Sequence, residues 1–105
     1  MDEQETLQKI VKAMRSAFQV RRVVLFGSHA TGTARPSSDY DILVIVDSEI
    51  PLVLRQGIAR VALESEVEIT ADLIVLTQAE FEKAHAKSYS VIRTAIETGK
   101  VLYAA

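Results

Sequence analysis

The sequence contains no cysteine, which excludes a disulfide framework and any metal site built from thiolates. It also lacks a hydrophobic run of the roughly 18 residues that a membrane-spanning helix needs. The first five residues are acidic and polar, which is the wrong chemistry for a secretory signal. These absences lead us to expect a soluble protein of the cytoplasm.

A strong charge of either sign is absent as well. The 105 residues include 12 lysines and arginines against 14 aspartates and glutamates, for a net charge of -2. No basic stripe of the kind found in dedicated nucleic-acid binders is visible, so we expect no direct nucleic-acid binding. Hydrophobic residues make up 49% of the chain, which is enough for one core. We predict one domain over residues 1–105.

The spacing of hydrophobic residues predicts an α/β or α+β domain of two layers, with a short mixed sheet flanked by helices. Helices are expected over residues 5–18 and 51–65, from Thr77 onward, and through Tyr89, Ile92, Arg93 and Ile96. Strands are expected over residues 20–26, 42–46 and 68–76, with a possible edge strand over 101–103. A loop is expected over residues 31–38.

Three details of this prediction concern the helix ends and one helix face. Thr77 and Glu80 have the spacing of a capping box, and Gly99 is placed to end the last helix. The helix over 51–65 is expected to turn four residues toward the core: Leu54, Ile58, Val61 and Ala62.

The segment with the clearest chemistry runs from the first expected strand to the second. Gly27-Ser28 ends one strand, ten residues follow, and Asp39-Tyr40-Asp41 opens the next. Side chains alternate along a strand, so Asp39 and Asp41, which are two residues apart, face the same side at about 6–7 Å from each other. Two adjacent carboxylates favour a divalent cation, and Mg²⁺ prefers a few carboxylate oxygens together with substrate phosphate. A glycine and the first N–H groups of a following turn suit a phosphate group.

A third carboxylate would complete a two-metal site. Asp72 is the best candidate, because it interrupts a hydrophobic strand where a charge needs a partner. There it could bridge the metal and the attacking group, or act as the general base. Glu66 and Glu68 are rivals in more polar surroundings.

These residues and their spacing resemble the DNA polymerase β-type nucleotidyltransferase superfamily, and its minimal nucleotidyltransferases in particular. The resemblance covers most of the chain, including the closing stretch 97–103. It implies that Asp39, Asp41 and Asp72 hold metal and that Gly27 and Ser28 bind the nucleotide. One departure is His29, where such sequences often carry arginine.

The resemblance also implies a function. Minimal nucleotidyltransferases are commonly antitoxins whose partner is a helical HEPN-domain ribonuclease, and some transfer AMP from ATP to a tyrosine of that toxin. We therefore expect a Mg²⁺-dependent nucleotidyltransferase that uses ATP and forms a complex with a HEPN-type toxin. Two alternatives remain: an antitoxin that neutralises its partner by binding alone, and a nucleotidyltransferase that acts on a small molecule such as an antibiotic.

Structural interpretations of the same residues are simpler. Asp39 and Asp41 could form a solvated turn, Ser28 an ordinary helix cap, and Asp72 an edge-strand charge. We expect His29 and His85 to be surface residues, Arg35 to be solvated, and Tyr89 and Tyr103 to serve packing.

Overall fold

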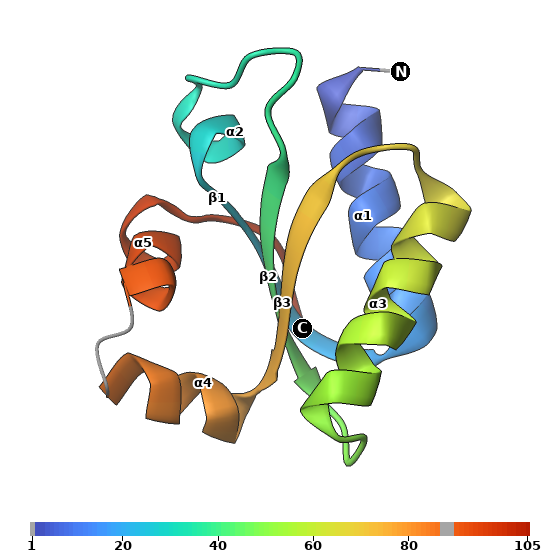
Figure 1. The fold of residues 1–105 in the computed structure, drawn as a ribbon, viewed down its shortest axis with the longest axis vertical. Coiled ribbons are helices and arrows are strands. Elements are labelled where there is room, and N and C mark those ends of the chain that lie inside the picture. Colours follow the sequence, from blue (N-terminus) through green and yellow to red (C-terminus); the bar gives the residue numbers. More distant parts are fainter. Residues whose placement is uncertain (1, 87–89) are drawn as a thin grey trace.

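The computed structural model describes residues 2–86 and 90–105 (Figure 1). The predicted helix position at Tyr89 lies outside the described residues. Within them, the helices are α1 (Glu3–Ala17), α2 (Ser28–Thr31), α3 (Leu52–Glu66), α4 (Gln78–Ala86) and α5 (Ser90–Thr98). The strands are β1 (Gln19–Phe26), β2 (Tyr40–Asp47), β3 (Ala71–Thr77) and β4 (Lys100–Ala104).

The four strands form one mixed sheet in the order β3-β2-β1-β4. β1 runs antiparallel to both β2 and β4, whereas β2 and β3 are parallel. The parallel pair follows from α3, which carries the chain back so that β3 starts at the same end of the sheet as β2. The edge strand expected over 101–103 is confirmed as β4.

Helices cover both faces of this sheet (Figure 1). On one face, α1 and α3 bury a core that includes Ile10, Met14, Ile42 and Leu63. On the other face, Ile92 and Ala95 of α5 pack with alternate strand residues such as Leu43 and Ile45, and α4 contributes Phe81 and Ala84. The α+β domain with a short mixed sheet is therefore confirmed, with three layers rather than two.

Most helix and strand boundaries lie close to the predicted ones. Asp2 caps α1 by accepting a hydrogen bond from the Glu5 N–H at 2.8 Å. The capping box is confirmed, since Glu80 accepts from the Thr77 N–H and donates its own N–H to the Thr77 hydroxyl. The third strand was predicted too long: residues 68–70 lead into it without strand structure. The start of the predicted loop, at Thr31, is helical.

The predicted inner face of α3 is wrong at three of its four residues, and right at Ala62, which packs against the core. Its buried residues are Arg55, Ala59 and Leu63. Leu54 and Val61 are 61% and 66% exposed, Ile58 is 39% exposed, and Ala62 is half-buried. Hydrophobic spacing alone chose the more hydrophobic face, although the helix presents another one to the sheet.

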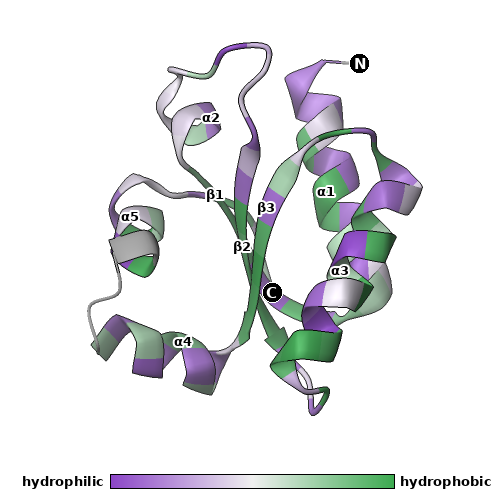
Figure 2. Cartoon of the chain, viewed as in Figure 1, coloured by the Kyte–Doolittle hydropathy of each residue, from purple (hydrophilic) through white to green (hydrophobic). Residues whose placement is uncertain are grey.

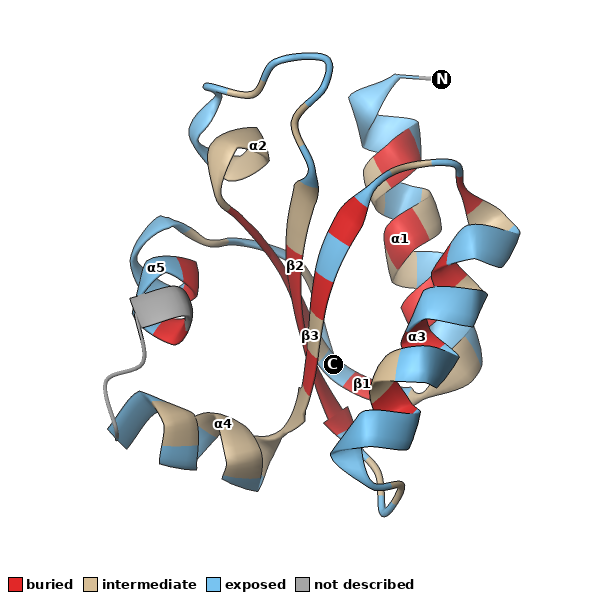
Figure 3. Ribbon diagram, in the orientation of Figure 1, coloured by how far each residue is buried: buried red, intermediate tan, exposed pale blue. Residues whose placement is uncertain are grey.

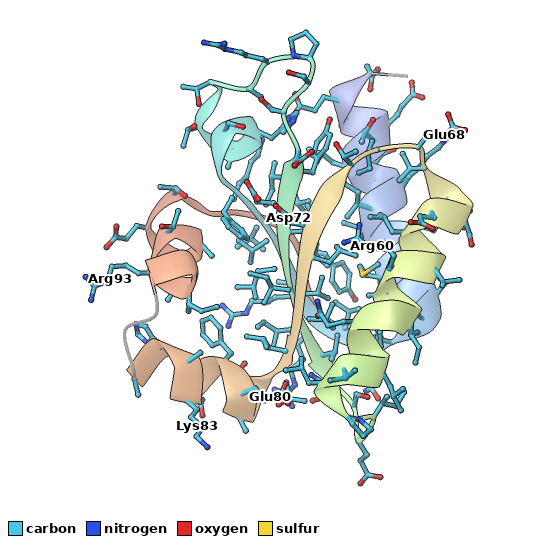
Figure 4. All side chains as sticks on the ribbon, in the orientation of Figure 1. Arg60, Glu68, Asp72, Glu80, Lys83 and Arg93 are labelled. Atoms are coloured by element: carbon cyan, nitrogen blue, oxygen red, sulfur yellow. The ribbon has the colours of Figure 1, made fainter. Side chains whose placement is uncertain are left out.

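The reason is the open edge of β3, which α3 satisfies with polar side chains. Arg55 donates to the Val75 carbonyl at 3.0 Å, and Arg60 donates to the Ala71 carbonyl at 2.8 Å. Gln56 donates to the Leu73 carbonyl and accepts from the Val75 N–H, both at 2.8 Å. An unpaired strand edge invites association with other chains, so these bonds both complete and protect the sheet. Figure 4 shows Arg60 directed from α3 toward β3.

Gly99 follows the end of α5, as predicted, but for a different reason. It is not among the glycines with positive φ, which in this chain are Gly27 and Gly32. A Cβ at Gly99 would instead lie 2.0 Å from the Ala95 carbonyl and 2.6 Å from a Val24 methyl. The position is therefore restricted to glycine by space between α5 and β1. Among the described residues, no helix is both long and hydrophobic enough to cross a membrane.

Candidate active site

The predicted site residues come from three strand ends that meet at one end of the sheet. Because β1 is antiparallel to β2 and β2 is parallel to β3, the end of β1 lies beside the starts of β2 and β3. Gly27 follows β1, Asp39 directly precedes β2, Asp41 is the second residue of β2, and Asp72 is the second residue of β3. Figure 4 places Asp72 in this upper part of β3, the end of the sheet at which α2 lies in Figure 1.

Asp41 and Asp72 occupy paired positions on the two parallel strands. Residues Leu43 and Ile74, two positions further along each strand, belong to the core beneath α4 and α5. Since side chains alternate along a strand, Asp41 and Asp72 face that same side. The sheet thus brings together two carboxylates that are 31 residues apart in the chain, as the sequence predicts.

Asp41 shows the electrostatic cost of this arrangement. Its pKa is raised above the ordinary value, first by partial burial and then by the negative charges of Asp72 and Asp39. A hydrogen bond between the carboxyls of Asp41 and Asp72 also favours the protonated form, while His29 opposes the shift. Three acidic groups therefore act on one another here, and Asp41 is the one most in need of a cation.

Gly27 lies directly against Asp41. A Cβ at Gly27 would fall 2.1 Å from Asp41 Oδ2, and the residue has φ of +71°, a conformation that side-chain-bearing residues rarely adopt. Both space and backbone conformation therefore require glycine. As a result, the backbone at the end of β1 reaches the carboxylates with no side chain between them.

Ser28 begins α2, a single helical turn in which the Ala30 and Thr31 N–H groups bond back to the Gly27 carbonyl. The sequence-based expectation of a short turn from Ser28 onward is confirmed. The first N–H groups of a helix have no partner within the helix, so those of Ser28 and His29 start without one. The turn therefore begins with free N–H donors directly after Gly27, whose backbone approaches Asp41.

His29 was expected to be a surface residue, and this expectation is wrong, because its side chain is only 11% exposed. Its ring stacks on Tyr40 with 3.7 Å between centroids. Nδ1 lies 3.3 Å from a Glu3 carboxylate oxygen, and Nε2 lies 3.0 Å from the Ser38 carbonyl. His29 thus ties the α2 turn to α1 and to the loop residue just before Asp39. The sequence feature that could have indicated this role is the histidine itself, which stands where similar sequences often carry arginine.

The remaining candidates lie away from this cluster or stay exposed. Glu66 ends α3 and pairs with Lys12 at 3.5 Å, and Glu68 follows in the connection to β3, which Figure 4 shows at the outer side. Arg35 and His85 are exposed, as expected. Tyr103 is half-buried beneath the Arg15 guanidinium, 4.6 Å from the ring centroid, which agrees with a packing role.

The carboxylates are spread too widely to form a closed metal cage by themselves. Within the described part of the chain, no three histidine, aspartate or glutamate side chains are already gathered as a metal-binding group. Asp39 and Asp72 are exposed, and Asp41 is half-buried. An open pair of carboxylates suits Mg²⁺, which completes its coordination with water and substrate phosphates.

Similarity to known proteins extends over most of the chain. The model of the nucleotidyltransferase domain family matches residues 7–101. The putative protein adenylyltransferase MJ0604 of Methanocaldococcus jannaschii is 31% identical over 105 residues, covering 98% of this chain and all of that protein. The protein adenylyltransferase MntA of Thermococcus cleftensis is 38% identical over 64 residues, covering 61% of this chain and 64% of that protein.

Solved structures share the fold. A chain of a toxin–antitoxin crystal structure with AMP-PNP superposes with a TM-score of 0.68 at 25% identity, covering 94% of this chain and 73% of that one. A chain of the tri-AMPylated Shewanella oneidensis HEPN toxin in complex with the MNT antitoxin gives 0.65 at 22% identity, covering 99% and 74%. At 22% identity, the similarity to this second chain shows a shared fold only. The extent of the family match and the full-length relative together show that this chain belongs to the nucleotidyltransferase domain family.

Proposed function

We propose that this protein is a protein adenylyltransferase that transfers AMP from ATP to a tyrosine hydroxyl of a HEPN-type toxin, as the antitoxin of a toxin–antitoxin pair. The observation that carries the proposal is the meeting of Asp39, Asp41 and Asp72 with the Gly27-Ser28 turn at one end of the sheet. Two relatives are named as protein adenylyltransferases, and a structural relative contains an ATP analogue in a toxin–antitoxin complex.

The reaction needs the α-phosphorus of ATP to be held in line with an incoming hydroxyl. The hydroxyl oxygen bonds to the α-phosphorus, the bond from the α-phosphorus to the bridging oxygen breaks, and pyrophosphate leaves. Ser28 and the first N–H groups of α2 would hold the β- and γ-phosphates. Gly27 would let those phosphates approach the backbone beside Asp41, where a side chain would block them.

Asp39 and Asp41 would hold Mg²⁺, and Asp72 would extend the site toward a second ion. The donor set fits, because burial and the charges of Asp72 and Asp39 raise the pKa of Asp41, and a bound cation would stabilise its charged form. When bound, Mg²⁺ would supply positive charge to the phosphates and the leaving pyrophosphate. The charges of the bound Mg²⁺ ions would thereby help to stabilise the transition state.

Asp72 is suited to take the proton of the attacking hydroxyl. It is exposed, and it pairs with Asp41 in the strand register, so an incoming group can reach it. The acceptor tyrosine would be delivered by the partner. We expect the two proteins to meet in the cytoplasm, where ATP is available.

The test is incubation of the protein with α-³²P-labelled ATP, Mg²⁺ and the protein encoded by the adjacent gene. Wild type should label the partner, and the Asp39→Asn/Asp41→Asn double variant should not. Asp47→Asn is the matched control, since Asp47 lies at the opposite end of β2 and pairs with Arg21 at 2.7 Å. Labelling that is equal in wild type and the double variant would overturn the proposed transfer.

Cell survival separates catalysis from binding. Cells that express the partner should be protected by wild type and by Asp47→Asn, and killed with the Asp39→Asn/Asp41→Asn variant. Protection by a variant that no longer labels the partner would instead assign the antitoxin role to complex formation alone.

A further inference from the structure

Most of the large hydrophobic side chains that are exposed among the described residues belong to α3. Val53, Leu54, Ile58 and Val61 are 83%, 61%, 39% and 66% exposed. Together with Gly57 they form one stripe along the helix, called here the α3 face. In Figure 2 this helix begins with hydrophobic residues, which Figure 3 colours as exposed. A hydrophobic stripe of this kind on a small protein marks an interaction surface.

Rotation of the helix cannot bury this face. The opposite side of α3 is fixed by Arg55, Gln56 and Arg60, whose side chains bond to the edge of β3. Arg55 also pairs with Glu80, which locks the helix to the start of α4. Turning α3 inward would break these bonds and expose the strand edge. The α3 face stays exposed because the opposite side of α3 covers the edge of β3. Only another molecule can bury it.

The face offers both parts of a self-complementary contact. Its large side chains flank a shallow groove that α3 shares with the end of α1, lined by small residues such as Ala17, Gly57 and Ala62. Open space surrounds Gly57, since a Cβ there would meet nothing within 4 Å. In an antiparallel pair of α3 helices crossing at Gly57, each Gly57 would lie opposite Ile58 of the second copy. The same register sets Leu54 against Val61.

Charge complementarity favours this antiparallel register. The first turn of α3 has no acidic residue, and its N-cap, Pro51, offers no side-chain cap. The last turn has no basic residue and contains the exposed Glu64. Each helix end thus lacks the charge that its dipole favours. Antiparallel pairing places the acidic end of one α3 beside the uncapped start of the other. Arg55 and Arg60, which would otherwise oppose each other, are already held against β3.

We propose that the α3 face is a homodimer interface, in which two copies of this chain pack α3 against α3 in antiparallel orientation. The interface lies on the α1 and α3 side of the sheet, whereas Asp41 and Asp72 face α4 and α5, so the dimer leaves both active sites open. One helix face is small beside the roughly 800 Å² per partner of a standard interface, so we expect association at micromolar concentrations. The inference does not depend on the proposed function.

The first test is the mass of the protein in solution by sedimentation velocity at about 1 to 200 µM. Wild type should shift from the 11.6 kDa monomer to twice that mass as concentration rises. Val61→Glu should stay monomeric with an unchanged circular dichroism spectrum. Val101→Glu is the matched control, because Val101 is 56% exposed on β4, and it should dimerise like wild type.

A wild-type protein that stays monomeric throughout this range overturns the homodimer. If such a monomer forms a complex with the adjacent-gene protein that Val61→Glu disrupts, a partner helix covers the α3 face instead. A dimer that survives Val61→Glu also overturns the proposal, since the contact then lies elsewhere.

Cysteine crosslinking tests the register. Because the chain has no native cysteine, only the introduced thiols can form disulfides. A mixture of Leu54→Cys and Val61→Cys proteins should form mixed disulfides under mild oxidation, because antiparallel packing brings these two positions together. Leu54→Cys alone should crosslink poorly, and Val101→Cys should form no disulfide-linked dimer. Efficient crosslinking of Leu54→Cys with itself would contradict the antiparallel arrangement.

Discussion

Gly27 and Asp41 show how closely residues must approach at this site. The Asp41 carboxylate occupies the space that any side chain at residue 27 would take, with 2.1 Å left for a Cβ. The residue also has φ of +71°. The lack of space and the positive φ are independent constraints, so a shift of Asp41 would make room for a Cβ but would not remove the backbone strain.

The Gly27→Ala variant should therefore lose adenylylation while remaining folded. The new methyl group must displace Asp41, and a shift of about 1 Å in such a group costs about 100-fold in rate. Single-turnover labelling of the partner measures this loss. Gly57→Ala is the matched control, since nothing lies within 4 Å of that position. It should keep full activity and gain up to about 1 kcal/mol of stability in the helix interior. Full activity of Gly27→Ala would contradict the role assigned to this close approach.

The raised pKa of Asp41 has a consequence for stability without metal. Burial and the charges of Asp72 and Asp39 raise it, so the folded protein favours the protonated form. The stabilising contribution of protonation is complete below the unfolded pKa and is lost as pH rises through the folded pKa. At neutral pH the charged Asp41 therefore destabilises the metal-free protein.

Asp41→Asn should raise the melting temperature of metal-free protein at pH 7, because asparagine removes the repelled charge. The gain should shrink as the pH falls toward the unfolded pKa of about 3.9, below which the carboxyl is protonated in both the folded and the unfolded protein. Thermal unfolding followed by circular dichroism in EDTA measures both effects. Asp47→Asn should give no gain, since that carboxylate pairs with Arg21. A less stable Asp41→Asn protein at pH 7 would mean that the acidic groups do not repel one another.

Among the elements, α3 and α4 are joined by a single buried arginine. Arg55, whose side chain is 3% exposed, donates to Glu80, to the Val75 carbonyl and to the Ile50 carbonyl. Its Nε is the one buried side-chain polar atom of the described residues without a partner. Four segments therefore depend on one side chain, which explains why a charged residue occupies the inner side of the helix.

Glu80→Gln should destabilise the protein at pH 7 by about 1 kcal/mol, because Arg55 would keep its buried charge without a carboxylate. The hydrogen bond from Arg55 is the main cause that lowers the pKa of Glu80. Its contribution is therefore present above the unfolded pKa of about 4.3 and is lost as pH falls through the lower folded value.

The difference from wild type should accordingly narrow below about pH 4. Urea unfolding at a series of pH values measures it, with Glu82→Gln as the exposed control on the same helix. A constant difference between pH 7 and pH 3 would exclude the ion pair as the cause.

For the molecule as a whole, the proposed nucleotide site exists only when the sheet is formed. Its residues follow β1, begin β2 and begin β3, so the unfolded chain has no equivalent arrangement. A ligand that binds the folded state alone stabilises it by mass action, by about 2.7 kcal/mol at 100 times its dissociation constant.

A non-hydrolysable ATP analogue with Mg²⁺ should therefore raise the melting temperature of wild type by roughly 10 °C at that saturation. The analogue without Mg²⁺ should give a smaller rise, and the Asp39→Asn/Asp41→Asn variant should show almost none. An equal rise in wild type and the double variant would place nucleotide binding elsewhere on the protein.

The sequence by itself predicted the candidate site residues and the elements on which they lie. The parallel return implied by a helix between two strands predicts that Asp72 lies beside Asp41 at one end of the sheet, and the strand register confirms it. This inference succeeds because it rests on local periodicity and on one common connection. Glycine at residue 27 is equally visible in the sequence, although the carboxylate that requires it is not.

Only the tertiary structure decided which side of α3 faces inward, and how His29 is held. Both depend on contacts between segments far apart in the chain: the open edge of β3 for α3, and Glu3 with the Ser38 carbonyl for His29. Hydrophobic spacing identifies a hydrophobic face but carries no information about unpaired backbone groups elsewhere. Satisfying those groups outweighed the burial of Leu54 and Val61, and left the hydrophobic face of α3 on the surface.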